Sequence, residues 1–127
     1  IASIANNGNI MKPYIVSKII NENNAIVFVN NAQVLNKLDI TLDKFKVVQE
    51  GMRGVVTMGS AQMLNNLTDM KVAGKTGTPQ IAGGQKTNAF FVAYAPYENP
   101  EILVLVLLEE PPEGSVVAIP VVDQVMR

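Results

Sequence analysis

The chain has 127 residues, enough for one folded domain, and its 48% hydrophobic and 17% charged residues are typical of folded proteins rather than disordered ones. The net charge of −1 comes from scattered charged residues, which argues against a nucleic-acid-binding surface. Cysteine and histidine are absent, which excludes disulfides, Ser-His-Asp triads, Cys-His dyads and histidine metal sites.

The N-terminal part predicts a helix end followed by a β-hairpin. Ile1 to Asn6 has the short apolar pattern of a helix end, and Asn7-Gly8 is a typical stop because both residues tolerate positive φ. Two runs of β-branched and aromatic residues, 14–20 and 25–29, are separated by a polar turn at 21–24. We expect these strands to pair and to close over a neighbouring helix, which is commoner than a free interaction surface.

A helix is predicted next, because from Thr41 to about Thr57 the apolar residues recur close to the helical period, with Thr41 as a candidate N-cap. Gly51 and Gly54 interrupt this pattern. Each lowers the stability of the helix by about 1 kcal/mol relative to alanine, unless close packing requires a glycine there. Methionines in such a pattern usually pack in the core, and three are assigned there: Met52, Met58 and Met63.

The stretch from Met70 to Gln80 holds Lys75 and Thr76 between Gly74 and Gly77, with Thr78 directly after them. Because a glycine has no Cβ, we expect these two to let another molecule approach the backbone closely. If the stretch is extended, the alternation of a strand puts Thr76 and Thr78 on the same face. Their hydroxyls and the nearby Lys75 ammonium would then form a receptor for a carboxylate. The backbone N–H groups around Gly77-Thr78 could also point at a developing oxyanion, as acyl-transfer chemistry requires.

Two plainer interpretations of this stretch compete with a binding site. Gly74-Lys75-Thr76 matches the end of the phosphate-loop pattern, but Asp69 stands where its first glycine belongs, and Thr78-Pro79 does not open an apolar helix. From spacing alone, an ordinary polar strand end with a solvated lysine is about equally compatible. Strict alternation also places Lys75 opposite the two threonines, so its stem must bend around or the strand must twist.

The rest of the chain predicts two more strands and a helix. Asn88 to Ala95 should be mostly covered on both faces, and Ile102 to Leu108, apolar on both faces, should be central or covered by helices. A terminal helix is expected near Ser115 to Met126, with Ser115 as a candidate cap and Pro120 as an unfavourable interior residue. Short connections imply antiparallel pairing, so we predict an α+β fold: a three-stranded antiparallel sheet with flanking helices and a small β-hairpin.

Four stretches resemble, in the same order, stretches of penicillin-binding proteins, the serine D,D-transpeptidases that cross-link peptidoglycan. Val72 to Gln80 looks like the K-T-G motif strand of that family, and Ala89 to Pro96 is similar to its aromatic next strand, which ends in proline. Ile4 to Gly8 and Gly51 to Val56 also resemble family stretches. The resemblance spans nearly the whole chain and implies the β-lactamase/transpeptidase-like fold. The K-T-G motif by itself is less specific, because serine β-lactamases share it.

The resemblance implies roles for four residues. Lys75 matches the motif lysine, which helps hold the catalytic hydrogen-bond network and attracts the substrate carboxylate. Thr76 and Thr78 match the hydroxyls that bind this carboxylate, and the Thr78 N–H would be one of two oxyanion donors. Gly77 would keep the strand flat enough for an acyl chain to lie against it. Lys75 and Thr78 are therefore the expected catalytic residues, and no cofactor or metal is implied.

The resemblance also implies the reaction and the partners. The substrates would be D-Ala-D-Ala stem peptides of peptidoglycan and the β-lactams that mimic them. A serine of the parent protein would be acylated by the penultimate D-alanine, and the acyl group would pass to an amine of a neighbouring stem. The implied partners are the rest of the transpeptidase domain and the cell-wall synthesis machinery, at the extracytoplasmic face of the bacterial cell membrane. The parent would be membrane-anchored, although no run in this chain approaches the roughly 20 apolar residues that span a bilayer.

Two motifs of the resembled family do not occur in the chain. Its nucleophile lies in S-x-x-K and its second catalytic serine in S-x-N, and no serine here has either spacing. We therefore expect residues 1–127 to be the C-terminal portion of one penicillin-binding transpeptidase domain, and we expect this portion alone to acylate nothing. A serine β-lactamase, a non-enzymatic membrane-bound β-lactam sensor domain and a plain interaction domain with a coincidental motif stay open as alternatives.

Overall fold

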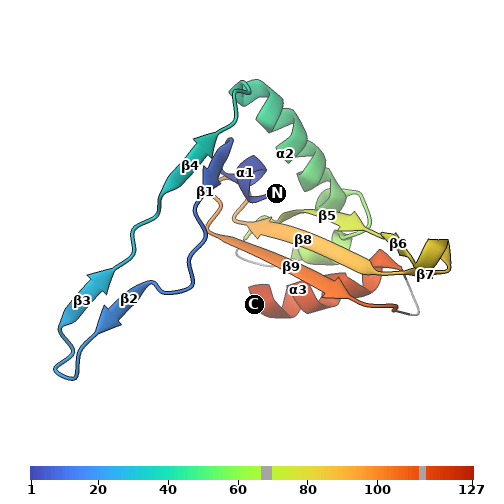
Figure 1. Ribbon diagram of the computed structural model, residues 1–127. Coiled ribbons are helices and arrows are strands. Elements are labelled where there is room, and N and C mark those ends of the chain that lie inside the picture. The colour runs from blue at the N-terminus through green and yellow to red at the C-terminus, as the bar shows by residue number, and fades with distance from the viewer. Residues whose placement is uncertain (67–69, 112–113) are drawn as a thin grey trace.

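The computed structural model describes residues 1–66, 70–111 and 114–127. This part of the chain forms a sheet flanked by helices, with a β arm that projects from it (Figure 1). The helices are α1 (Ala2–Ala5), α2 (Leu42–Thr57) and α3 (Ile119–Met126), with 3-10 turns at Gln62–Asn66, Ala82–Gly84 and Ser115–Ala118. The strands are β1 (Asn9–Met11), β2 (Lys18–Ile20), β3 (Ile26–Val29), β4 (Val34–Lys37), β5 (Ala73–Gly77), β6 (Gln80–Ile81), β7 (Lys86–Thr87), β8 (Ala89–Ala95) and β9 (Ile102–Leu108).

The main sheet has three antiparallel strands in the order β5-β8-β9. β8 is the middle strand, and its Ala93 lies opposite Gly74 of β5 on one side and Val104 of β9 on the other. Figure 1 shows α2 and α3 flanking this sheet. The predicted α+β class with a three-stranded antiparallel sheet is therefore confirmed.

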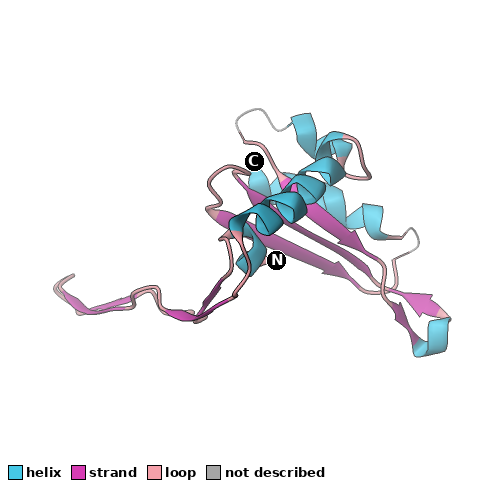
Figure 2. Ribbon diagram, turned by 90° about the horizontal axis from the view of Figure 1, so that it is seen from above, coloured by secondary structure: helices cyan, strands magenta, loops and turns pink. Residues whose placement is uncertain are grey.

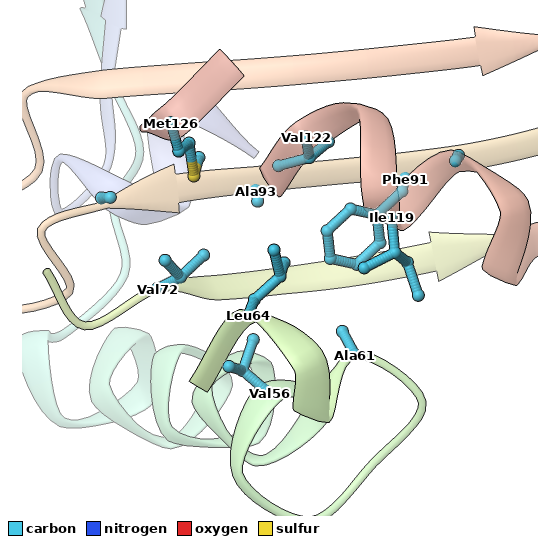
Figure 3. Close-up of a cluster of buried hydrophobic side chains, with 11 residues drawn as sticks. Val56, Ala61, Leu64, Val72, Phe91, Ala93, Ile119, Val122 and Met126 are labelled. Atoms are coloured by element: carbon cyan, nitrogen blue, oxygen red, sulfur yellow. The ribbon is translucent and has the colours of Figure 1, made fainter. Parts of the chain in front are cut away.

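The larger hydrophobic cluster lies on the sheet face that carries Phe91 and Ala93 (Figure 3). It joins α2, the 3-10 turn after it, the sheet and the C-terminal helix. Its buried members are Val56, Ala61, Leu64, Val72, Phe91, Ala93, Ala95, Ala118, Ile119, Val122 and Met126. Full burial of one large apolar side chain is worth about 1.5–3 kcal/mol, so this cluster is the main source of stability in the described part of the chain.

A smaller cluster on the opposite face attaches α1 to the sheet. It contains Ala5 of α1, Met52 of α2, Ala73 of β5 and Tyr94 of β8. Burial raises the pKa of Tyr94 to about 12, so its phenol stays neutral at ordinary pH. The two clusters together bury both faces of the sheet near the start of β5.

The predicted helix from Thr41 to Thr57 is confirmed as α2, with Thr41 at the N-cap position. Phe45, Met52 and Val56 are its buried residues, which recur at helical spacing on one side. The assignment of Met58 and Met63 to the core is wrong, because their side chains are 78% and 44% exposed. Met58 caps the end of α2 and Met63 lies in the following turn, where the helical period no longer applies.

Gly51 in α2 has no packing role, because a Cβ added there would meet no heavy atom within 4 Å. Gly51→Ala is therefore expected to raise the free energy of unfolding by about 1 kcal/mol, the difference in helix propensity between the two residues. Urea-induced unfolding followed by circular dichroism measures this change. The contrasting variant is Gly8→Ala, which should destabilise: Gly8 has φ +97°, and its Cβ would lie 2.8 Å from Cζ of Phe45.

The arm is built from two short antiparallel ribbons, β1–β4 at its base and β2–β3 at its tip (Figures 1 and 2). The hairpin predicted at 14–29 is confirmed in β2 and β3, but the expectation that it closes over a helix is wrong. Every residue of β2 and β3 is exposed, and both figures show the tip pointing away from the helices. The apolar side chains of these strands are therefore not buried by any part of the chain that the structure describes.

β9 also differs from its prediction. It lies at an edge of the three-stranded sheet within the described residues, not at its centre. Val104, Val106 and Leu108 are partly buried against the larger cluster, whereas the alternate residues Leu103, Leu105 and Leu107 are exposed. A continuous apolar run predicts two covered faces, and the described part of the chain covers one.

The C-terminal helix begins later than expected. A 3-10 turn occupies Ser115–Ala118, and α3 begins at Ile119 with Ala118 at its N-cap, so Ser115 does not cap it. Pro120 falls in the first turn of α3, where its missing N–H breaks no helical hydrogen bond. Among the ranges that the structure covers, no helix has the length and apolarity needed to cross a bilayer.

Candidate functional site

The lysine-threonine stretch lies on β5, at one edge of the main sheet in the described part of the chain. Lys75 and Thr78 are exposed, and Thr76 and Gly77 are half-buried. The preceding residues, Ala73 and its neighbours, are buried under α2 and the two clusters. The stretch is therefore neither sealed in the core nor curled into the start of a helix.

The pairing of β5 with β8 fixes which face each residue occupies. Lys75 lies opposite Val92, and Thr76 lies opposite Phe91. Directly opposed residues of an antiparallel pair share a face, so Thr76 is on the side of the larger cluster and Lys75 is on the other side, as alternation predicts. The ladder ends at Gly77. The expectation that Thr78 shares the face of Thr76 therefore stays a prediction.

The Lys75 side chain bends onto the backbone of its own strand. Its Nζ donates a hydrogen bond of 2.8 Å to the carbonyl oxygen of Thr76. The stem thus bends so that the ammonium lies beside the motif backbone. That the ammonium reaches the face of the threonines stays a prediction. Lys75 forms no ion pair with any residue the structure describes.

Gly74 is required by packing inside the protein. A Cβ at this position would lie 2.7 Å from Cζ of Phe91 and 2.9 Å from the carbonyl oxygen of Val92. The expectation that the flanking glycines leave room for another molecule is wrong for Gly74, because the Phe91 ring fills that room. Gly77 differs, since its Cβ would meet only Cβ of Phe90 at 3.4 Å, an ordinary contact.

Gly74→Ala is expected to lower the free energy of unfolding by about 1–3 kcal/mol, the usual range for overpacking a core. The aromatic ring can turn away only by disturbing the cluster, and the Val92 carbonyl is held in the sheet. Thermal unfolding monitored by circular dichroism measures the loss. Gly77→Ala is the matched control on the same strand and should change stability by less than about 0.5 kcal/mol. Equal losses in the two variants would contradict the packing explanation.

The turn after the motif is held to the end of β9. β6 and β7 pair as a short hairpin, with Gly83 and Gly84 at positive φ at its tip, which confirms the turn predicted there. Lys86 forms an ion pair of 2.6 Å with Glu110, and the Glu110 N–H donates to Oδ1 of Asn88 at 3.2 Å. The end of the motif stretch is tied to the same region, because the Asn88 N–H donates to the carbonyl oxygen of Pro79 at 3.0 Å.

The start of the motif strand is held by contacts that the sequence did not predict. Arg53 of α2 donates to the carbonyl oxygen of Val72 at 2.7 Å, and the Tyr97 N–H donates to that of Lys71 at 2.7 Å. Lys71 also forms an ion pair with Glu98, and this hydrogen bond holds the pKa of the Glu98 carboxyl below its ordinary value. No local pattern signals these contacts, since Arg53 and Val72 are 19 positions apart and Lys71 and Glu98 are 27 apart.

This arrangement suits the recognition of an anion by a strand edge. It offers an ammonium without an ion-pair partner among described residues, an exposed and a half-buried hydroxyl, and backbone groups near an unobstructed glycine. Hydrogen bonds from charged donors to a carboxylate are stronger than neutral ones, so such an edge would orient a substrate that ends in a carboxylate.

The comparisons with known proteins agree on one family. The penicillin-binding protein transpeptidase domain family matches residues 1–127. The chain is 35% identical over 122 residues to penicillin-binding protein 2A of Bacillus subtilis, an alignment that covers 85% of this chain and 17% of that protein. It is 31% identical over 142 residues to the peptidoglycan D,D-transpeptidase MrdA of Haemophilus influenzae, covering 97% of this chain and 21% of that protein.

A solved structure gives the same answer for the fold. The D,D-transpeptidase domain of a peptidoglycan glycosyltransferase from Eggerthella lenta is similar with a TM-score of 0.78 and 29% sequence identity. The match covers 98% of this chain and 29% of that one. The chain spans 17% of the length of the Bacillus subtilis relative and 21% of that of the Haemophilus influenzae relative.

Proposed function

This chain belongs to the penicillin-binding protein transpeptidase family, and we propose that residues 1–127 are the C-terminal portion of one serine D,D-transpeptidase domain. The nucleophilic serine would come from the part of the domain that precedes them. The observation that carries the proposal is that Lys75 to Gly77 form the accessible end of β5, an edge strand among the described residues. Exposed Thr78 follows directly, and the lysine ammonium lies beside the motif backbone.

Each residue of the motif has a proposed role. Lys75 helps hold the catalytic hydrogen-bond network and attracts the carboxylate of the substrate. The hydroxyls of Thr76 and Thr78 bind that carboxylate, and the Thr78 N–H donates to the oxyanion of the tetrahedral intermediate. Gly77, where an added Cβ would make only an ordinary contact with Phe90, lets the acyl chain lie against the strand.

The proposed reaction is acyl transfer through a serine ester. The serine oxygen attacks the carbonyl of the penultimate D-alanine of a stem peptide, the peptide bond breaks, and the terminal D-alanine leaves with a proton on its amine. An amine of a neighbouring stem then attacks the ester, which forms the cross-link and returns the proton to the serine. A β-lactam would acylate the same serine as its ring amide opens, and the ester would persist.

We also propose that the preceding part of the domain covers the open face of the main sheet. Phe90 and Val92 of β8 are half-buried there, and Leu103, Leu105 and Leu107 of β9 are exposed on the same face by register. A contiguous apolar surface of this kind is typical of an interface. The complete protein would act at the extracytoplasmic face of the bacterial cell membrane, anchored there, together with other cell-wall synthesis proteins.

Labelled penicillin tests the proposal on the longer parent protein. A stable covalent adduct is expected, followed by cross-linking when stem peptides are supplied, and residues 1–127 alone should form no adduct. Rapid turnover of the label would favour a serine β-lactamase. A stable adduct without cross-linking activity would favour a β-lactam sensor, and no adduct would leave an interaction domain as the better explanation.

A further inference from the structure

Arg53 joins three elements just ahead of the motif strand. It lies on α2, its Nη1 donates to the carbonyl oxygen of Val72 at 2.7 Å, and its Nη2 donates to Oδ1 of Asn65 at 2.7 Å. Asn65 belongs to the 3-10 turn after α2, and Val72 directly precedes β5. One guanidinium therefore links the helix, the turn and the start of the strand that ends in the lysine-threonine motif.

We infer that Arg53 is a positioning residue, which sets the place of the motif strand so that Lys75, Thr76 and Thr78 meet the acyl group correctly. The inference rests on the proposed function for its catalytic consequence, but the contacts that carry it are independent of that function. Arg53 touches no reacting atom and acts through the backbone of Val72.

The side chain has the chemistry that this role needs. A guanidinium offers several N–H donors in one rigid plane, so two of them can hold two separate acceptors at fixed relative positions. A lysine has the same charge but a single nitrogen on a flexible stem, and it cannot reproduce the two-pronged geometry. Charge alone therefore does not replace Arg53.

A second set of contacts holds the neighbouring residue, Lys71, from the connection between β8 and β9. The Tyr97 N–H donates to the carbonyl oxygen of Lys71, and the Lys71 ammonium pairs with Glu98. Positions 71 and 72 are thus fixed from α2 on one side and from the connection between β8 and β9 on the other.

The position of Val72 is transmitted to the motif because the intervening strand is stiff. Every residue from Ala73 to Gly77 is paired with β8. Gly74 lies so close to the Phe91 ring that even a methyl group would clash. Val72 itself is fully buried in the larger cluster. A shift at the start of the strand therefore moves its far end, and a misplacement of about 1 Å can cost about 10²-fold in rate.

The test uses Arg53→Lys and Asn65→Ala in the full-length protein, with Arg127→Lys as the matched control. Arg127 is likewise an arginine whose guanidinium makes two hydrogen bonds, but both go to Asp123 on α3. Two measurements are made: amide hydrogen exchange of the peptide spanning 72–80, and the rate constant of acylation by labelled penicillin per folded molecule.

We expect Arg53→Lys to raise exchange in the 72–80 peptide and to lower the acylation rate constant by roughly 10- to 100-fold. Asn65→Ala removes one of the two acceptors, so it should change the exchange and the acylation rate constant in the same direction but by less. This variant takes the place of Arg53→Lys in the test if Arg53→Lys does not fold. Arg127→Lys should change neither. A purely structural role would lower the melting temperature and leave the acylation of folded molecules unchanged.

The outcomes separate this inference from the proposed function. Unchanged exchange at 72–80 in Arg53→Lys, or in Asn65→Ala if the first variant does not fold, would overturn the inference. This holds whatever the rate constant of acylation by penicillin. Raised exchange with unchanged acylation would overturn the catalytic consequence. If the wild-type protein forms no adduct but exchange rises in the variants, the proposed function fails and the structural role of Arg53 stands.

Discussion

Lys75→Met is expected to lower the rate of acylation of the full-length protein by labelled penicillin by about 10²–10³-fold, the loss typical of removing one preorganised donor at a reacting centre. Methionine keeps a long flexible stem and removes the ammonium. The lysine is exposed, and its described side-chain hydrogen bond goes to the adjacent Thr76 carbonyl. The free energy of unfolding should therefore change by less than about 0.5 kcal/mol.

The matched control for this variant is Lys44→Met, the same substitution at an exposed lysine on α2. It should change neither the acylation rate nor the stability. The rates are measured by quenching the reaction at short times and separating the labelled protein, and the stabilities by urea-induced unfolding. A Lys75→Met variant that is acylated as fast as the wild type would remove Lys75 from the catalytic machinery.

Phe91→Ala is expected to lower the free energy of unfolding by about 3–5 kcal/mol, the range for truncating a fully buried aromatic residue. Phe91 is 0% exposed, stands on the middle strand of the sheet and packs in the larger cluster between the strands and the C-terminal helix (Figure 3). It also fills the space beside Gly74. Its loss should therefore loosen the motif strand as well as the core.

Phe28→Ala is the comparison for Phe91→Ala, because it makes the same change on the exposed tip of the arm, where the side chain is 45% exposed. Its effect should stay below about 1 kcal/mol. Urea-induced unfolding of both variants beside the wild type gives the two differences directly. Similar losses at the two positions would mean that the arm is buried in solution or that the cluster does not govern stability.

The elements that sequence reasoning identified correctly carry strong local signals. α2 combines a helical period over its whole length with a threonine at the N-cap, and β8 holds three aromatic residues and a valine within seven positions. The motif strand was found through its two glycines and its lysine-threonine cluster. In each case the information lies within a short window, where propensity and periodicity act.

The failures on β2, β3 and β9 have one physical origin, which is that burial depends on neighbours outside a short window of sequence. The apolar residues of β2, β3 and β9 predict covered strands, yet the described chain leaves β2 and β3 exposed and covers one face of β9. The pairing of β1 with β4 was missed because both strands are short and lack alternation. Pro120 looked unfavourable only because the expected helix began a turn too early.

In the candidate site too, the sequence reveals the local pattern but not the long-range contacts. The motif residues Lys75 to Thr78 were recognised from their order, but the contacts that hold their strand could not be. Arg53 reads as one charged residue on a helix, and only the folded chain brings its guanidinium to Val72 and Asn65. Similarly, Gly74 looked like an opening for a ligand until the pairing of β5 with β8 placed the Phe91 ring against it.

At high concentration, the chain by itself should oligomerise through the outer side of β9. Within the described residues this strand pairs only with β8, so its other side presents a row of backbone donors and acceptors on a segment without charge or proline. Such a segment readily accepts a strand from another molecule. Leu105→Lys, on the face away from the larger cluster, would introduce a charge that opposes this association and should keep the isolated chain monomeric.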